Sequence, residues 1–424
     1  MRVIISQLFS ISTMLIACSI LIFASFPTSA RTYHAHVHSG TTLREALSLA
    51  RDGDTIRLMP GIHIGSMFEV KHSITVIGHK DAVVDGQSSG GSIFIVTADN
   101  VAFRNLTIRN VAVSYVDDHA AIKILKRKGA DIEGCRIENG FFAIYLSNSA
   151  DCRIANNVII GTKRDETAAG NGIHAWTCRN ILVTGNRVYG HRDGIYFEFM
   201  RRGTVLNNHS ETNARYGLHF MFSDSCSYRN NIFEANGAGV AVMYTKHIEM
   251  IGNTFINNWG PTSYGLLLKD IADGYLSNNL FDHNSVAIHA EGLNRILFTR
   301  NHFIRNGYGL RILGACEDNT VTENMFDGNT FDVTTHSRES SNFFRRNYWS
   351  SYEGYDLDRN GIGDVPHHPV RLYSLLVEQM PSSVILMHTA FINILDLTER
   401  VVPTITPEAL VDAEPLMRPL PLRK

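Results

Sequence analysis

The sequence lacks an excess of either charge and has few cysteines. It contains 39 lysine and arginine residues against 41 aspartate and glutamate residues, a formal net charge of −2. Nucleic-acid-binding domains carry a strongly basic surface, so this balance gives no support to a nucleic-acid partner. Without Cys18, which lies in an N-terminal leader, an odd number remains, which excludes complete disulfide pairing within one chain. We expect buried small residues, or alternatively a redox or metal-ligand pair, at Cys135, Cys152, Cys178, Cys226 and Cys316.

Long apolar runs are also scarce, and the first lies at the N-terminus. Arg2 precedes it, and residues 28–30 (Thr-Ser-Ala) resemble a small-x-small cleavage site. We therefore predict that residues 1–30 are a signal peptide and that the mature chain begins at Arg31, outside the cytoplasm. Two alternatives stay open: a lipoprotein-type processing site at Cys18, and an uncleaved anchor.

The second apolar stretch lies near the C-terminus. Its run from Pro381 to Leu395 is shorter than the roughly 20 residues that a transmembrane helix needs. We expect an apolar surface that is covered by the end of the protein's own fold or by a partner. Residues 403–421 hold five prolines and should be extended. Residues 371–424 are thus predicted to be a docking segment with a Pro-rich tail.

Two columns of residues recur along the chain in steps of 22 to 29 residues. The first column comprises Gly172, Gly194, Gly217, Gly239, Gly265, Ala287, Gly309 and Asp332. The second comprises Asn157, Asn186, Asn208, Asn231, Asn253, Asn279, Asn301, Asn324 and Asn347. In most rows an apolar or aromatic residue follows the asparagine two places later. Self-similarity at such a period indicates a solenoid.

The residue types indicate which solenoid this is. Apolar residues alternate with period 2 inside each repeat, as Leu218, Phe220 and Phe222 do, which is typical of strands. The asparagine column fits an internal ladder of amides that hydrogen-bond between coils spaced roughly 4.8 Å apart. The sequence therefore predicts an all-β parallel β-helix over residues 55–349. A capping-box pattern, Thr42-x-x-Glu45, predicts a helix from Thr42 to Arg51 within an N-terminal cap of residues 31–54.

One face of the central coils has an unusual composition. Strand alternation places His219, Met221 and Met243 on the outside, where solvated strands usually carry small polar or charged residues. Thioether and imidazole groups together suit Cu(I), so we predict a copper site at these three residues, flanked by Glu198 and His174.

The same face has a second interpretation. Methionine and aromatic residues are also common in protein interfaces. The alternative is therefore a partner-binding patch that includes Trp176, Tyr196 and Met200, and both functions can coincide.

An Asp/Gly-rich loop, residues 350–370, follows the last repeat. Positions 1, 3, 5 and 9 of a calcium-loop pattern are occupied by Asp356, Asp358, Asn360 and Asp364. Gly361 stands at position 6, but His367 replaces the usual glutamate at position 12. We predict a candidate calcium site here, with a Gly-rich closing turn as the alternative.

Three segments resemble the NosD family: YGLHFMFS from Tyr216, GVAVMYT from Gly239 and NYWSSYEGYDLDRNGIGDVPHHP from Asn347. The apolar C-terminal segment with its Pro-rich tail extends the resemblance over the whole mature chain. It implies a right-handed β-helix protein of the periplasm that serves the maturation of nitrous oxide reductase. The implied partners are an ABC transporter membrane subunit, a copper-chaperone lipoprotein and the apo reductase, which receives its copper–sulfur centre. No family ligand pattern matches the copper site proposed above, which depends on strand alternation alone.

Enzymes form the alternative class, because parallel β-helices include polysaccharide lyases and uronate epimerases. Their catalysis needs an acid–base group and charge neutralisation in a groove. The nearest candidates are His191, Arg192, Asp193 and Glu198. A substrate groove would show several outward arginine, lysine and aspartate residues on adjacent coils, whereas this face is aromatic and rich in methionine and histidine. We therefore expect a protein that is not an enzyme, with a surface adhesin as a third class.

Overall fold

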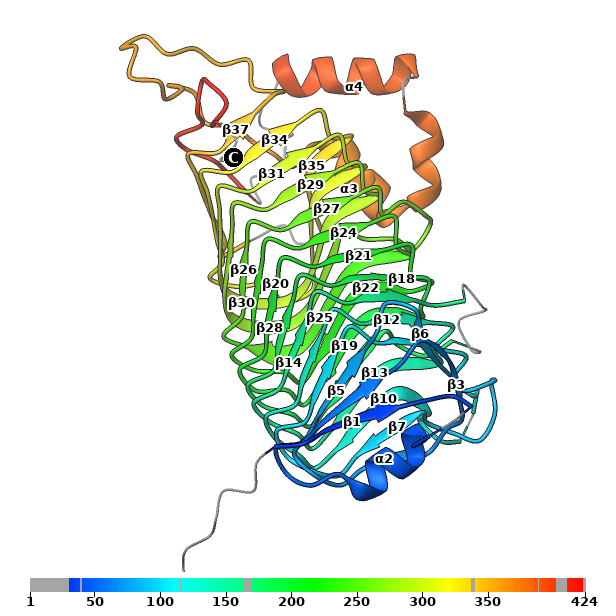
Figure 1. Cartoon of the computed structure of the whole chain (residues 1–424). Helices are drawn as coiled ribbons and strands as arrows, with labels where there is room; N and C mark the ends of the chain where they lie inside the picture. Colours follow the sequence, from blue (N-terminus) through cyan, green and yellow to red (C-terminus); the bar gives the residue numbers. More distant parts are fainter. Residues whose placement is uncertain are drawn as a thin grey trace, which may run out of the picture.

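The structure is a computed structural model that describes residues 30–38, 40–114, 116–162, 169–336, 340–387, 389–401 and 410–421. The predicted signal peptide, apart from Ala30, lies outside these residues. The named strands pair in parallel and stack into an elongated solenoid (Figure 1). The predicted all-β parallel β-helix is confirmed.

Each coil contributes strands to three faces. The first face comprises β1 (Thr32–Ala35), β2 (Thr55–Leu58), β5 (Thr75–Gly78), β8 (Ala102–Arg104), β11 (Asp131–Glu133), β14 (Arg153–Ala155), β17 (Leu182–Thr184), β20 (Thr204–Leu206), β23 (Ser227–Arg229), β26 (Glu249–Ile251), β33 (Thr320–Thr322) and β36 (Phe343–Arg345). The second comprises β4 (Phe68–Val70), β7 (Phe94–Val96), β10 (Ala120–Leu125), β13 (Phe142–Ser147), β16 (Ile173–Trp176), β19 (Asp193–Glu198), β22 (Tyr216–Met221), β25 (Ala238–Lys246), β32 (Tyr308–Leu313) and β35 (Phe331–Thr335). Two long strands, β28 (Leu266–Ser277) and β30 (Val286–Thr299), belong to both.

The third face is a separate sheet of 13 strands, one for each coil. It comprises β3 (Gly61–Ile64), β6 (Ala82–Asp85), β9 (Thr107–Arg109), β12 (Arg136–Glu138), β15 (Val158–Ile160), β18 (Arg187–Tyr189), β21 (His209–Glu211), β24 (Ile232–Glu234), β27 (Thr254–Ile256), β29 (Leu280–Asp282), β31 (His302–Ile304), β34 (Met325–Asp327) and β37 (Tyr348–Trp349). Its inward aromatic rings stack from coil to coil, as Phe281 on Phe303 at 5.1 Å and Phe326 on Trp349 at 4.4 Å. These stacks confirm that the residues two places after the asparagines lie in the core.

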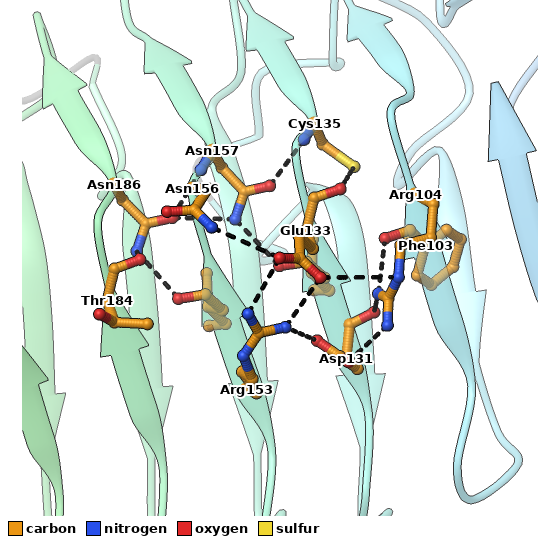
Figure 2. Close-up of polar contacts among 12 residues, drawn as sticks. Phe103, Arg104, Asp131, Glu133, Cys135, Arg153, Asn156, Asn157, Thr184 and Asn186 are labelled. Carbon is orange, nitrogen blue, oxygen red and sulfur yellow. Dashed lines mark hydrogen bonds and ion pairs between the residues drawn. The ribbon is translucent and has the colours of Figure 1, made fainter. Parts of the chain in front are cut away.

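The predicted asparagine ladder runs through the interior. Asn157 Nδ2 donates to Asn186 Oδ1 at 2.9 Å, and the backbone N–H of Asn157 donates to the same oxygen at 2.9 Å. Figure 2 shows the first rung, where the N–H of Cys135 donates to Asn157 Oδ1, beside a surface network that joins Arg153 to Glu133. The pattern repeats in every later coil through Asn347. The five cysteines outside the leader are free and buried among these coils, as predicted.

A second ladder, which we did not predict from the sequence, runs beside the first. It comprises Asn213, Asn236, Asn258, Asn284, Asn306 and Asn329. Its backbone and side-chain bonds repeat those of the first ladder. These asparagines also recur at intervals of one repeat, so the sequence contained the signal for this second ladder.

Helices cover both ends of the solenoid. At the N-terminal end, α2 (Leu43–Leu49) begins at Thr42, whose side chain and that of Glu45 form the predicted capping box, and Leu43 and Leu47 are buried. At the C-terminal end lie α3 (Leu372–Gln379), the 3₁₀ helix η2 (Pro381–Leu386) and α4 (Ala390–Val401). No helix in the described ranges is long and apolar enough to span a membrane.

The apolar C-terminal segment divides into a covered part and an open part. In α3, Tyr373 and Val377 pack against Phe331 of the solenoid. Glu378 is buried there, accepts two 2.8 Å hydrogen bonds from the Arg311 guanidinium and accepts a third from Thr334. In α4, by contrast, large apolar side chains are exposed: Phe391, Ile394 and Leu397.

The Pro-rich tail ends the first asparagine ladder. Asp412 is fully buried, and its carboxylate accepts hydrogen bonds from Asn347 Nδ2 at 2.9 Å, from the Arg346 and Asn347 backbone at 3.0 Å and from Trp349 Nε1 at 3.1 Å. Leu416 forms a parallel bridge with Tyr348. The described part of the tail thus covers the last coil, and removal of everything after Pro369 would expose it.

We therefore predict that Asp412→Ala lowers the free energy of unfolding by about 3 kcal/mol, because buried donors lose their acceptor. Urea-induced unfolding followed by circular dichroism measures this. The matched control, Glu317→Ala at an exposed position, should change it by less than about 0.5 kcal/mol. Equal stability of the two variants would show that the tail does not terminate the ladder.

Candidate metal- and partner-binding face

The second face of the solenoid places three of the five predicted copper ligands in one column. Met221 of β22 lies directly opposite Met243 of β25, and Glu198 of β19 lies opposite Met221 in the next coil. In the neighbouring column, Tyr196 separates His174 from His219. Adjacent strands are roughly 4.8 Å apart, so the two thioethers can reach one ion. Two thioethers suit Cu(I), and of the two histidines only His219 stands on the strand of Met221, whereas His174 lies two coils away.

Imidazole and phenol rings stack on the outside of this face. His174 lies parallel to Tyr145 and to Tyr196, with ring centroids 4.8 Å apart in both pairs, and His219 meets Tyr196 edge to face at 4.9 Å. Burial, assisted by Arg192, lowers the pKa of His174 to about 3. This imidazole is therefore neutral at physiological pH, which is the form that binds metals.

His219 differs from the expectation of a solvent-facing ligand. It stands on the outer side of the sheet, but only 3% of it is exposed, because Tyr196 and Tyr216 pack against its ring. Its Nδ1 lies 3.7 Å from the fully buried carboxylate of Asp193 and 3.5 Å from Arg215 Nη2. Its Nε2 is buried and has no hydrogen-bond partner. A metal that binds His219 through Nε2 would therefore need a small displacement of the covering rings.

The prediction that Met200 contacts a partner is wrong, as is the prediction that Phe222 belongs to the core. Met200 is fully buried, whereas Phe222 is 42% exposed. The chain turns after Glu198 and after Met221 through residues with left-handed backbone angles, Phe199 at φ 52° and Phe222 at φ 49°. Such a turn ends the strand alternation, so the residue after the turn points inward. Trp176 and Tyr196 remain on the outer side, the former 38% exposed.

Two of the four candidate catalytic residues of the enzyme alternative are buried, and Arg192 and Glu198 are partly exposed. His191 and Asp193 are buried, and burial lowers the pKa of His191 to about 4. Arg192 lies 3.7 Å from Asp193 and Glu198 accepts a hydrogen bond from the Tyr196 hydroxyl. An acid–base pair that must reach a polysaccharide in a groove is not formed by these residues.

The structure also forms a polar cluster that the sequence reading missed. His209, Glu211 and Glu234 on the third face offer ligand atoms within 4.8 Å of one another. Their charges are already engaged, since His209 Nε2 lies 3.1 Å from Glu234 and Arg187 pairs with Glu211. The sequence gives one indication of this cluster, which is that the three residues lie on the adjacent strands β21 and β24.

The Asp/Gly loop is closed by its own hydrogen bonds. The Asp356 carboxylate accepts from the backbone of Asn360 at 3.1 Å and of Gly361 at 2.9 Å, and Asp364 accepts from Leu357 at 2.7 Å. Hydrogen bonds from the loop backbone, led by Gly361, outweigh burial and lower the pKa of Asp356. The ionised side chain and the turn at Gly361 agree with a calcium loop, which stays a prediction.

We predict that millimolar Ca²⁺ raises the melting temperature of the protein, because an ion that binds only the folded state stabilises it. Mg²⁺ at the same concentration should have a smaller effect, since Mg²⁺ is reluctant to lose its water. Differential scanning calorimetry in the presence of calcium or a chelator measures the shift. Asp356→Asn combined with Asp358→Asn should abolish it; an equal shift in this variant would place calcium elsewhere.

Fold and face together define a class: a parallel β-helix protein that carries thioether, imidazole and aromatic groups on one outer face. The family model of NosD, described as periplasmic copper-binding protein, matches residues 157–354. Over this segment the chain is similar to the NosD family.

Whole-chain comparisons extend this match. A Pseudomonas aeruginosa protein named probable ABC transporter binding protein NosD is 28% identical over 394 residues, which cover 88% of this chain and 91% of that protein. A Stutzerimonas stutzeri protein of the same name is 27% identical over 398 residues, or 89% and 90% of the two chains. The structure of a Yersinia enterocolitica family 28 exopolygalacturonase matches with a TM-score of 0.57 at 9% identity, covering 74% of this chain and 77% of that chain, which shows the fold alone.

Proposed function

We propose that this protein is a periplasmic accessory factor that passes copper during assembly of the copper–sulfur centre of nitrous oxide reductase. The observation that carries the proposal is the register of Met221 with Met243, with the unpartnered Nε2 of His219 on the same strand as Met221. The family description, periplasmic copper-binding protein, supports the same compartment and metal. Copper is here the cargo, received from a copper-chaperone lipoprotein and released to the apo reductase.

The arrangement suits brief binding rather than storage. Two thioethers on a rigid strand pair supply soft ligands without an enclosing cavity, and the Glu198 carboxylate lies one coil away. Ligands on an open surface let a second protein approach the ion from outside and exchange its ligands one at a time. A polysaccharide lyase or uronate epimerase is the second candidate, and burial of His191 and Asp193 disfavours it.

We predict that Met221→Leu with Met243→Leu abolishes high-affinity Cu(I) binding, measured by competition with a chromophoric Cu(I) chelator. Both methionines are only partly exposed, but leucine has a similar volume, so stability should change by less than about 1.5 kcal/mol per site. In cells the reductase should then lack its copper–sulfur centre. The control exchanges two exposed methionines elsewhere, Met67→Leu with Met380→Leu. A complete centre in cells with normal levels of the site variant would refute a required role for the pair.

We further propose that α4 attaches the solenoid to the membrane subunit of an ABC transporter. Its exposed side chains Phe391, Ile394 and Leu397 follow at intervals of three residues and share one side of the helix. An exposed apolar patch of this kind marks an interaction site. The curated relatives carry the name ABC transporter binding protein, which supports this partner.

We predict that Phe391→Ser with Ile394→Ser prevents co-purification with the transporter and leaves the solenoid folded. These side chains are exposed, so the substitution removes little packing within the protein. The control, Ile64→Ser, removes an equally exposed apolar side chain at the opposite end of the solenoid. If the α4 variant still co-purifies with the transporter, the contact lies on another surface.

A further inference from the structure

Three consecutive coils place an exposed aromatic residue at the same turn. Phe199 stacks on Phe222 with ring centroids 5.3 Å apart and planes 9° apart, and Phe222 stacks on Tyr244 at 5.1 Å and 14°. Between 42% and 47% of each residue is exposed. We call these three residues the aromatic ridge.

The backbone at this turn does not favour aromatic residues. Phe199, Phe222 and Tyr244 have φ angles of 52°, 49° and 54°. In this left-handed region glycine, asparagine and aspartate are preferred, and bulky residues are rare. At the equivalent turn the other coils carry Lys126, Asn148, Thr177, Asp270, Gly292 and Gly314, so four of these six residues are glycine, asparagine or aspartate and none is aromatic. The backbone conformation therefore gives no reason for aromatic residues at this turn, and their exposure points to a partner.

The ridge borders the candidate copper ligands. Phe222 directly follows Met221, and Tyr244 directly follows Met243 in the next coil. Trp176 lies in the methionine column and adds a fourth exposed aromatic side chain on the same side. A protein that brings an ion to the two thioethers therefore finds the ridge directly beside them.

Basic side chains lie beyond the ridge, on the side away from the methionines. They are exposed and form no salt bridge within the described part of the chain: Arg179, Arg201, Arg202 and Lys246. The carboxylates beside them are Asp224, opposite Arg201 in register, and Asp273, which forms a salt bridge with Arg295. Asp270 follows Tyr244 in the column of the ridge. The surface thus has an apolar centre with a positive border, which is complementary to a partner with an apolar patch and a negative border.

We propose that the aromatic ridge is the docking surface of the protein that delivers Cu(I), and that this donor carries an apolar patch bordered by carboxylates. The inference rests on the proposed function, because it takes Met221 and Met243 as the acceptor ligands. Stacked aromatic side chains are frequent anchors of interfaces. The basic border steers the donor and fixes its orientation, so association should weaken as the salt concentration rises.

The test uses Phe222→Asn with Tyr244→Asn in the full mature chain. Asparagine occupies this turn at Asn148, so the variant should fold and melt at the same temperature as the wild type or higher. Isothermal titration measures binding of the copper-chaperone protein, prepared without its lipid anchor and without copper. We expect binding to weaken about tenfold or more, the loss typical of buried aromatic anchors. The control, Tyr275→Ser, removes an aromatic residue that is 37% exposed outside the ridge and should leave the affinity unchanged.

A second measurement separates docking from metal binding. Cu(I) alone, in competition with a chelator, should bind the ridge variant as tightly as the wild type, while Met221→Leu with Met243→Leu loses it. Unchanged chaperone affinity in the ridge variant would overturn the inference, and so would a parallel loss of Cu(I) affinity, which would place the rings in the metal site. Normal Cu(I) binding by the methionine variant would overturn the copper site of the proposed function, whereas docking of the copper-free chaperone is judged independently.

Discussion

The asparagine ladder is the constraint on which the rest of the solenoid depends. Each buried amide oxygen accepts both the backbone N–H and the side-chain N–H of the asparagine one coil earlier, as Asn231 Oδ1 does from Asn208. The same amide donates to a carbonyl of a neighbouring coil, as Asn231 Nδ2 does to Val205. An unpartnered buried amide costs about 1–3 kcal/mol, so each coil must keep its register with the next. A slip of one residue would also move every core side chain to the outside.

This register holds side chains of the outer surface in fixed positions relative to one another, without a cavity. Residues in one column of adjacent coils are held about one strand spacing apart, so identical or complementary side chains form stacks and pairs. The stack of His174 with Tyr196, the pair of Met221 with Met243 and the aromatic ridge all arise in this way. The ladder inside thus positions the ligands outside, and substitutions in a column change the surface without changing the fold.

The periodic features could be predicted from the sequence, and the features that break the period could not. The asparagine and glycine columns predict coils, faces and strand pairs, and Thr42 with Glu45 predicts the capping helix. Alternation fails where a strand ends, which is why Met200 was expected outside and Phe222 inside. His219 is buried because the ring of Tyr216 packs against it. Strand alternation predicts which side of the sheet a residue faces, but not whether a neighbouring side chain covers it. Asp412 accepts a hydrogen bond from Asn347, the last asparagine of the ladder, 65 residues earlier in the chain. The Pro-rich tail contains no repeat from which this contact could be predicted.

The last coils and the central coils of the second face differ in what covers them. Over the last coils α3 covers it, with Glu378 buried between Arg311 and Thr334, whereas the methionine coils remain open. Met243 lies four coil steps from the coil of Thr335 (through β28, β30 and β32), or about 19 Å at strand spacing. The proposed attachment through α4 would therefore hold a partner at a fixed distance from the methionines, because the laddered coils between them keep their register. In that proposal the asparagine ladder sets the position of the candidate copper ligands relative to the C-terminal helices.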